Sequence, residues 1–271
     1  MQVFVEIDGR RLALRRLGGD ARGRPTLIFL HEGLGSITMW KDFPDELARA
    51  TGLPALIYDR FGHGRSDQLA LPRPPDFLEI EAERLLPELL KKTGIDRPIL
   101  IGHSDGGTIA LLHAAAFPEC VVACISEAAH VLFEPAIREA LSGVVRRWRQ
   151  DPGFRRRLAR HHRDADRLLE GWAAWWLAPE RGDWAMIEKL PRITCPVMVV
   201  QGDRDEHGTE IHAEAIMAGV TGLAEKLALK GIGHVPHHEA RPAVVAAIAR
   251  FVASVLAGAG AGGSSDQDCC T

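Results

Sequence analysis

The stretch "LIGHSDGGTIALL" at residues 100–112 joins an apolar run to a helical pattern through a serine set among glycines. Ser104 lies between Gly102 and Gly106, in the arrangement G-x-S-x-G. Between a buried strand and a helix, this arrangement is typical of a sharp turn that holds the serine at positive φ and exposes its hydroxyl. Side chains at 102 or 106 would collide with the adjoining strand and helix. An ordinary tight turn is the alternative, and the rest of the chain must decide between the two.

Short apolar runs alternate with helical patterns along the chain. "TLIFL" (26–30) and "PVMVVQG" (196–202) are continuous apolar runs, which suit parallel strands buried on both faces. Helical stretches such as "DFLEIEAERLLPELLKKTG" (76–94) stand between such runs, and a hairpin is expected around Asp8-Gly9. Alternation of this kind predicts an α/β fold, with a parallel sheet flanked by helices.

The alternation stops between residues 131 and 190, where no strand pattern occurs. This segment holds five of the six tryptophans, namely Trp148, Trp172, Trp175, Trp176 and Trp184. We interpret residues 131–190 as a helical cap over the end of the sheet; the alternative is that the rings fill a small core of the insertion itself. The core domain is then residues 1–130 and 191–257, and the Gly- and Ser-rich residues 258–271 are expected to be a flexible tail.

Composition narrows the class of protein. A chain of 271 residues can bury one large core, and its net charge of −3 gives no electrostatic reason to expect nucleic acid as a partner. We find no apolar run long enough to span a bilayer and no secretory signal pattern at the start, so no membrane partner is expected. Five scattered cysteines argue against a disulfide framework and favour the cytoplasm.

A serine hydroxyl needs a base to become a nucleophile, and the base needs an orienting carboxylate. The segment "VMVVQGDRDEHGT" (197–209) ends a buried strand in acidic residues, including Asp205. The segment "KGIGHVPHHEARP" (230–242) places His234 in a Gly-rich loop before the last helix. The order serine, acid, histidine is that of the α/β-hydrolases.

Four segments together resemble the capped, esterase-like α/β-hydrolases over roughly residues 3–256. They are "HEGLGS" (31–36), "DRFGHGRSD" (59–67), "GHSDGG" (102–107) and "GIGHVPHHEARP" (231–242). In that family they correspond to the oxyanion loop, a Gly-rich loop, the nucleophile turn and the histidine loop. The resemblance implies a mostly parallel eight-stranded sheet flanked by helices, with a helical cap insertion.

The resemblance also implies catalytic roles. Ser104 would be the nucleophile, His234 the general base and then acid, and Asp205 the carboxylate that orients His234. Asp203 stands two residues before Asp205 and would face the other side of an extended chain. Glu127, which follows the strand-like run "VVACIS", is an alternative acid.

The oxyanion hole would be formed by the backbone N–H groups of Gly33 and Asp105, with Leu34 as the next candidate donor. The family commonly has glycine where this chain has Glu32. This carboxylate could pair with a cation such as Arg60 or a substrate group, or have a purely structural role. The side chain of Asp105 is expected to make helix-capping or local hydrogen bonds.

These residues predict a serine hydrolase that cleaves a small or medium apolar ester or lactone through an acyl-enzyme. The expected substrate-binding residues are His103, Trp172, Trp175 and Trp176. Neither a cofactor nor a metal is expected, and the oligomeric state is left open. One alternative is hydrolysis of a carbon–carbon bond in diketone-like ring-fission products. Another is a non-catalytic small-molecule receptor on the same fold.

Overall fold

The computed structural model describes residues 3–19 and 21–259, and within these ranges eight strands form one mostly parallel sheet. The strand order is β1-β2-β4-β3-β5-β6-β7-β8, and the β1–β2 and β2–β4 pairs are antiparallel. This confirms the predicted fold. The strands are β1 (Val3–Ile7), β2 (Arg10–Leu17), β3 (Thr26–Leu30), β4 (Ala55–Tyr58), β5 (Pro98–His103), β6 (Ala123–Glu127), β7 (Val197–Gly202) and β8 (Ala224–Leu229).

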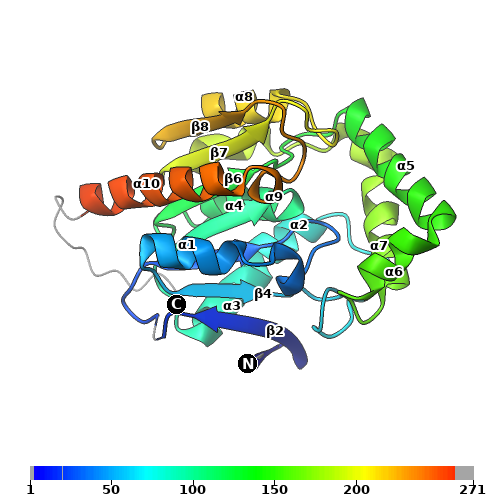
Figure 1. Cartoon of the computed structure of the whole chain (residues 1–271), viewed down its shortest axis with the longest axis horizontal. Helices are drawn as coiled ribbons and strands as arrows, with labels where there is room; N and C mark the ends of the chain where they lie inside the picture. Colours follow the sequence, from blue (N-terminus) through cyan, green and yellow to red (C-terminus); the bar gives the residue numbers. More distant parts are fainter. Residues whose placement is uncertain (1–2, 20, 260–271) are drawn as a thin grey trace.

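Helices cover both faces of the sheet (Figure 1). Helix α1 (Phe43–Thr51) and the long α10 (Arg241–Ala259) pack together on one face. The other face is covered by α3 (Leu86–Thr93), α4 (Asp105–Ala116) and α8 (Ile211–Gly219). The shorter helices between these elements are η1 (Ile37–Trp40), α2 (Phe77–Ile80), η2 (Glu81–Leu85) and α9 (Pro236–Glu239).

Helix ends follow from proline and glycine at defined positions. Pro44 in α1 and Pro87 in α3 stand in the first turn, where a backbone N–H is not needed. Gly52 and Gly94 end these two helices in the left-handed conformation, which glycine adopts without a Cβ penalty. The predicted helix at 76–94 forms as one helical run from Phe77 to Thr93, in which η2 is a π-helical turn between α2 and α3.

The register of the central strands brings several loops to one edge of the sheet. Leu30 of β3 pairs with Gly102 of β5, and Gly102 pairs in turn with Ser126 of β6. Glu127 at the end of β6 pairs with Val200 of β7. Parallel strands all point the same way, so the segments that follow β3, β5, β6 and β7 meet at their carboxyl ends. In open α/β sheets this is where ligands bind.

The connection from β6 to β7 is a helical insertion. It contains α5 (Pro135–Gln150), α6 (Pro152–Ala159), α7 (Ala165–Trp176), η3 (Pro179–Asp183) and η4 (Ile187–Arg192). Figure 1 shows α5, α6 and α7 as a separate layer at the right-hand end of the sheet. Trp148, Leu158, Ala165 and Leu169 form a small core within this layer. Trp148 therefore packs inside the insertion, in agreement with the alternative considered for these rings.

No stretch of residues is assigned to strand β8 by the sequence analysis. Strand β8, "AEKLAL", is only partly buried and lies at the edge of the sheet. Its polar residues hide the continuous apolar run that marks the central strands. An edge strand pairs on one side only and needs less apolar surface.

Helix α10 corrects the expectation that no stretch is long and apolar enough for a bilayer. Residues Arg241–Gly258 pass that test by length and composition, with a mean hydropathy of 1.5, and 28% of this window is buried. The mean hydropathy is high because the alanines, valines and isoleucines contribute more to it than Arg241 and Arg250 subtract. This is weak evidence for a span, because core helices pass the same test. Val244, Ile248 and Phe251 of α10 pack in the core with α1. Of the predicted tail, Gly258 and Ala259 belong to α10, and residues 260–271 lie outside the described residues.

Replacement of Gly106 by alanine tests the packing of α4 on the sheet. A Cβ on Gly106 would overlap the carbonyl oxygen of Leu30. Gly106→Ala should therefore lower the free energy of unfolding by about 1–3 kcal/mol, as in overpacked cores, when measured by denaturant titration. Gly182→Ala is the matched control, because a Cβ there meets no atom within 4 Å. Equal stability of the two variants would contradict the close packing.

Candidate active site

Ser104 adopts the strained conformation that the sequence predicts. Its φ is 53° and its ψ is −120°, and it directly precedes α4. Such a conformation in a non-glycine residue costs about 1–3 kcal/mol and persists only where the surroundings enforce it. Gly102 and Gly106 provide the room, since a Cβ on Gly102 would overlap the carbonyl oxygen of Gly106. The backbone N–H of Ser104 donates to the carbonyl oxygen of Glu127 at 2.9 Å, which fixes the turn against β6.

Asp205 and His234 form a buried pair. The Nδ1 atom of His234 lies 2.8 Å and 3.0 Å from the two carboxylate oxygens of Asp205. Asp205 also accepts from the backbone N–H of His207 at 2.8 Å and from Gln201 Nε2 at 2.9 Å. Burial by itself would raise the pKa of Asp205, but the His234 hydrogen bond and these donors outweigh it and hold the pKa below its usual range. Asp205 is therefore a carboxylate at neutral pH.

The two other candidate acids have different partners. Both carboxylate oxygens of Glu127 contact His237 Nδ1, at 3.0 Å and 2.9 Å, and one of them also accepts from the His237 backbone N–H. Asp203 accepts from the backbone N–H of Gly231. Of these three acids, Asp205 alone has a hydrogen bond to the His234 ring within the described residues.

A cavity of about 270 Å³ brings the predicted residues together. Ser104, His234, Gly33, Asp105 and His103 all line it. In the described residues Ser104 and the His234 ring have no direct hydrogen bond, and such bonds often tighten only when substrate is bound. The insertion provides an apolar wall from three helices, namely Ile137, Leu141, Val144, Phe154, Leu158, Trp172 and Trp176.

Trp175 is not among the residues that line this cavity. Its indole N–H donates to the carbonyl oxygen of Pro74 at 2.7 Å, and its ring packs edge-on against Phe77. Trp175 therefore fixes α7 to the segment before α2. Of the three tryptophans expected at the substrate, the structure brings Trp172 and Trp176 to the cavity.

The loop at residues 31–36 has backbone N–H groups without acceptors among the described residues. In the described part of the chain, the N–H groups of Gly33, Leu34 and Asp105 have no hydrogen-bond acceptor. Two histidines bind the carbonyl oxygens of this loop: His63 Nε2 lies 3.1 Å from Gly33 O, and His162 Nε2 lies 2.9 Å from Leu34 O. The N–H groups of the loop can therefore donate to a bound group, and Leu34 remains an alternative to Gly33 as the predicted oxyanion donor.

The Asp105 side chain connects the turn at Ser104 with the insertion. Its Oδ1 accepts from Trp176 Nε1 at 3.0 Å, and a Cβ on Gly33 would overlap the indole nitrogen of Trp172. Burial raises the pKa of Asp105, and the guanidinium groups of Arg60 and Arg73 oppose that rise. The predicted local capping bond is replaced by this contact to α7, because the side chain faces the insertion.

Two histidines that the sequence analysis missed surround His234. The His207 ring centroid lies 4.4 Å from that of His234, and His130 stacks on the same ring at 6.0 Å. Burial lowers the pKa of His207 to about 4 and moves that of His130 in the same direction. Both are therefore neutral beside the pair. His207 follows Asp205 by two residues, and His130 follows β6. The sequence could have indicated both histidines as site residues, because each stands shortly after the end of a predicted strand.

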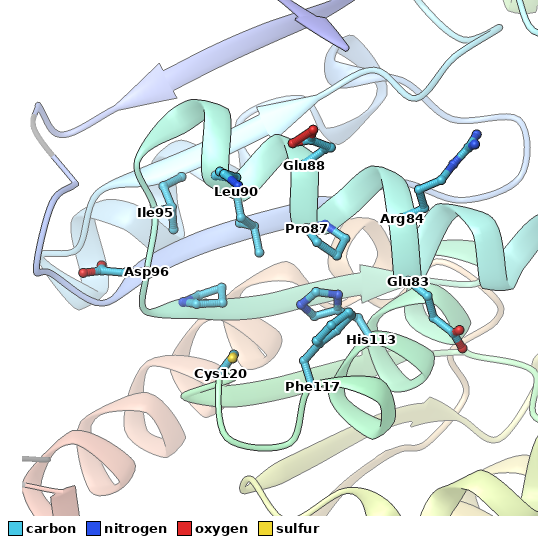
Figure 2. A pocket seen from close by; sticks show the side chains of 12 residues that line it. Glu83, Arg84, Pro87, Glu88, Leu90, Ile95, Asp96, His113, Phe117 and Cys120 are labelled. Carbon is cyan, nitrogen blue, oxygen red and sulfur yellow. The ribbon is translucent and has the colours of Figure 1, made fainter. Parts of the chain in front are cut away.

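A second cavity lies at the other end of β5 (Figure 2). It has a volume of about 290 Å³, and its wall includes Leu90, Ile95, Pro98, His113 and Phe117. Pro98 begins β5 whereas Ser104 follows its end. A strand of this length separates the two by about 20 Å, so the second cavity is remote from the Asp205–His234 pair. Among the residues that the structure describes, no group of three or more His, Cys, Asp or Glu side chains could hold a metal ion.

The sheet order, the helical layers and the strained serine after β5 define the α/β-hydrolase fold. A model of the alpha/beta hydrolase family matches residues 27–248, which is most of the chain. The chain therefore belongs to the alpha/beta hydrolase family.

Known relatives with different activities resemble this chain. It is 34% identical over 110 residues to an sn-1-specific diacylglycerol lipase of Mus musculus, covering 41% of this chain and 34% of that protein. It is 37% identical over 103 residues to a proline iminopeptidase of Levilactobacillus brevis, covering 36% and 32%. The chain thus matches about a third of the length of these two relatives. The enol-lactonase from Burkholderia xenovorans LB400 superposes with a TM-score of 0.73 at 19% identity, covering 93% of this chain and 100% of that one.

Removal of the Trp176 indole N–H tests the connection between the insertion and the turn. Trp176→Phe leaves Asp105 Oδ1 buried without its donor, which should lower the free energy of unfolding by about 1–3 kcal/mol in denaturant titrations. Trp184→Phe is the matched control, since the Trp184 indole nitrogen is buried and has no hydrogen-bond partner among the residues that the structure describes. A Trp176→Phe variant as stable as Trp184→Phe would show that the hydrogen bond contributes nothing.

Proposed function

We propose that this protein is a serine hydrolase that cleaves a small or medium apolar ester or lactone through an acyl-enzyme. The observation that carries the proposal is the 2.8 Å hydrogen bond between Asp205 and His234, because the His234 ring lines the same cavity as Ser104, which has a positive φ. A serine, a histidine and a buried carboxylate in this relation are the parts that acyl transfer requires.

The reaction begins when His234 takes the proton of the Ser104 hydroxyl and the oxygen attacks the substrate carbonyl. Asp205 stabilises the imidazolium that forms on His234. The backbone N–H groups of Gly33 and Asp105 stabilise the oxyanion of the tetrahedral intermediate, and one such donor typically contributes about 3–4 kcal/mol. His234 then protonates the leaving alkoxide, so the ester C–O bond breaks and the acyl group stays on Ser104. His234 then deprotonates a water molecule, whose oxygen attacks the acyl carbon; the bond to Ser104 Oγ breaks, His234 returns the proton to Oγ, and the acid leaves. In a lactone the leaving alcohol remains part of the product.

The cavity supports an apolar substrate of limited size. Its volume of about 270 Å³ is near the lower end for small-molecule sites. Helices α5, α6 and α7 line it with aliphatic and aromatic side chains. A small apolar acyl or alcohol group fits this wall, whereas a polymer does not fit such a volume. Relatives named as a lipase and a lactonase are consistent with ester chemistry.

Ser104→Ala tests the nucleophile. The purified protein should hydrolyse p-nitrophenyl acetate or butyrate, and Ser104→Ala should abolish this hydrolysis. A fluorophosphonate should label the unmodified protein at Ser104, as shown by mass spectrometry of the peptide. Cleavage of a dienoic diketone without turnover of any ester or lactone would favour carbon–carbon hydrolysis instead. Ligand binding without labelling would favour the receptor.

Asp205→Asn tests the acid against its neighbour. The amide cannot stabilise the His234 imidazolium, so kcat should fall by about 10⁴-fold, as for the equivalent change in a serine protease. Asp203→Asn is the matched control, because an amide oxygen can still accept from Gly231 N–H, and it should keep kcat within about threefold. A large fall in kcat in Asp203→Asn, with little change in Asp205→Asn, would show that Asp203 is the carboxylate that stabilises His234.

A further inference from the structure

His103 lies between two acceptors that belong to different loops. It is the last residue of β5, directly before Ser104, and it is 1% exposed. Its Nε2 lies 2.7 Å from the backbone carbonyl oxygen of His234. Its Nδ1 lies 3.6 Å from Oε2 of Glu32 in the oxyanion loop. The His103 ring therefore contacts the loop that carries His234 and the loop that carries Gly33, and its backbone leads directly into Ser104.

The surroundings of the two ring nitrogens favour the doubly protonated form of His103: Nε2 must carry a proton to donate to the His234 carbonyl oxygen, and the Glu32 carboxylate, 3.6 Å from Nδ1 and thus beyond hydrogen-bond distance, attracts a positive charge there. A neutral imidazole donates from one nitrogen only. Burial would lower the pKa of His103, but the carboxylate of Glu32, the nearby Glu127 and the His234 carbonyl outweigh burial and raise the pKa to about 9. The interaction with His103 likewise outweighs burial at Glu32 and holds the pKa of Glu32 well below its usual range. The two side chains form an ion pair at neutral pH.

Glu32 takes His103 rather than Arg60 as its cation. Arg60 Nη2 donates to the backbone carbonyl oxygen of Glu32 at 2.9 Å and so holds the loop, but the carboxylate points to His103. The Glu32 side chain is 24% exposed and lines the cavity with Ser104. Glu32, which stands where the family commonly has glycine, therefore pairs with His103, and His103 in turn donates to the backbone carbonyl of His234.

We propose that the Glu32–His103 ion pair is a positioning pair, which fixes the backbone of His234 so that its ring faces Ser104. The proposal rests on the hydrolase function given above. The histidine loop is rich in glycine, and Gly231 has a φ of 76°. Side chains hold the N–H groups of this loop, since Glu239 accepts from Gly233 and Val235 and Glu206 accepts from His234. His103 holds the His234 carbonyl and completes the set.

Other titratable groups also face His103. The rings of His234 and His237 each lie 5.0 Å from its ring centroid, and Glu127 and His207 are near enough to act on it electrostatically. As the pH rises through about 9, His103 loses one proton and with it the positive charge that pairs with Glu32. Below that pH both contacts persist. Activity should therefore show a loss on the alkaline side that depends on Glu32.

Imidazole ¹⁵N NMR of the full chain labelled at histidine tests the ion pair without any substrate. The His103 signals, assigned by their absence in His103→Gln, should show an imidazolium at pH 7.5 and a midpoint near pH 9. Glu32→Gln keeps the shape but removes the charge, so the midpoint should fall by at least about one pH unit. A neutral His103 at pH 7.5, or a midpoint unmoved in Glu32→Gln, would overturn the proposal even if the protein hydrolysed esters well.

Kinetics test the positioning itself. With p-nitrophenyl butyrate, His103→Gln should lower kcat by about 10- to 100-fold, as a misplaced catalytic group does, with KM changed less than about threefold. The alkaline limb of kcat should shift to lower pH in Glu32→Gln.

His113→Gln is the matched control. His113 is a buried histidine whose Nδ1 bonds the carbonyl oxygen of Ala82, remote from the site, so the pH profile of this variant should match that of the unmodified protein. An unchanged kcat and pH profile in both site variants would refute the positioning role. Absence of turnover in the unmodified protein would count against the hydrolase and leave the NMR result to decide the ion pair.

Discussion

The close approach of α4 to β3 and β5 is the constraint on which the site depends. The carbonyl oxygens of Leu30 and Gly106 occupy the space that Cβ atoms on Gly106 and Gly102 would need. Because the helix begins so near the sheet, the chain must turn sharply after β5, and Ser104 takes a positive φ. The same turn directs the first N–H of α4 and the serine hydroxyl towards the edge where the other loops gather.

Three carboxylates at this edge each contact a histidine. Asp205 contacts His234, Glu127 contacts His237, and Glu32 contacts His103. Each pair joins segments far apart in the sequence, and an isolated buried charge would cost several kcal/mol. The pairs therefore define which loop sits against which. Only the first pair bears on proton transfer in the proposed reaction, and the third connects three of the loops around it.

The helical insertion is joined to the site by polar as well as apolar contacts. Trp176 donates to Asp105, and Trp172 lies directly against Gly33. A larger residue at 33 would exclude Trp172, so the glycine of the oxyanion loop also determines how near α7 comes. The two tryptophans of the cavity wall thus contact the two residues whose N–H groups are proposed to stabilise the oxyanion.

The sequence by itself determined the α/β fold, the strained serine and the insertion, because each follows from local features: apolar runs, the spacing of glycines and the loss of strand pattern. It also placed Asp205 after a buried strand and His234 in a Gly-rich loop before the last helix. Tertiary structure decided what depends on side chains meeting across the fold. Glu32 contacts His103 rather than Arg60, Trp175 turns away from the cavity, and His130 and His207 surround His234. No local pattern encodes these contacts, since each joins residues that only the register of the sheet and the position of α7 bring together.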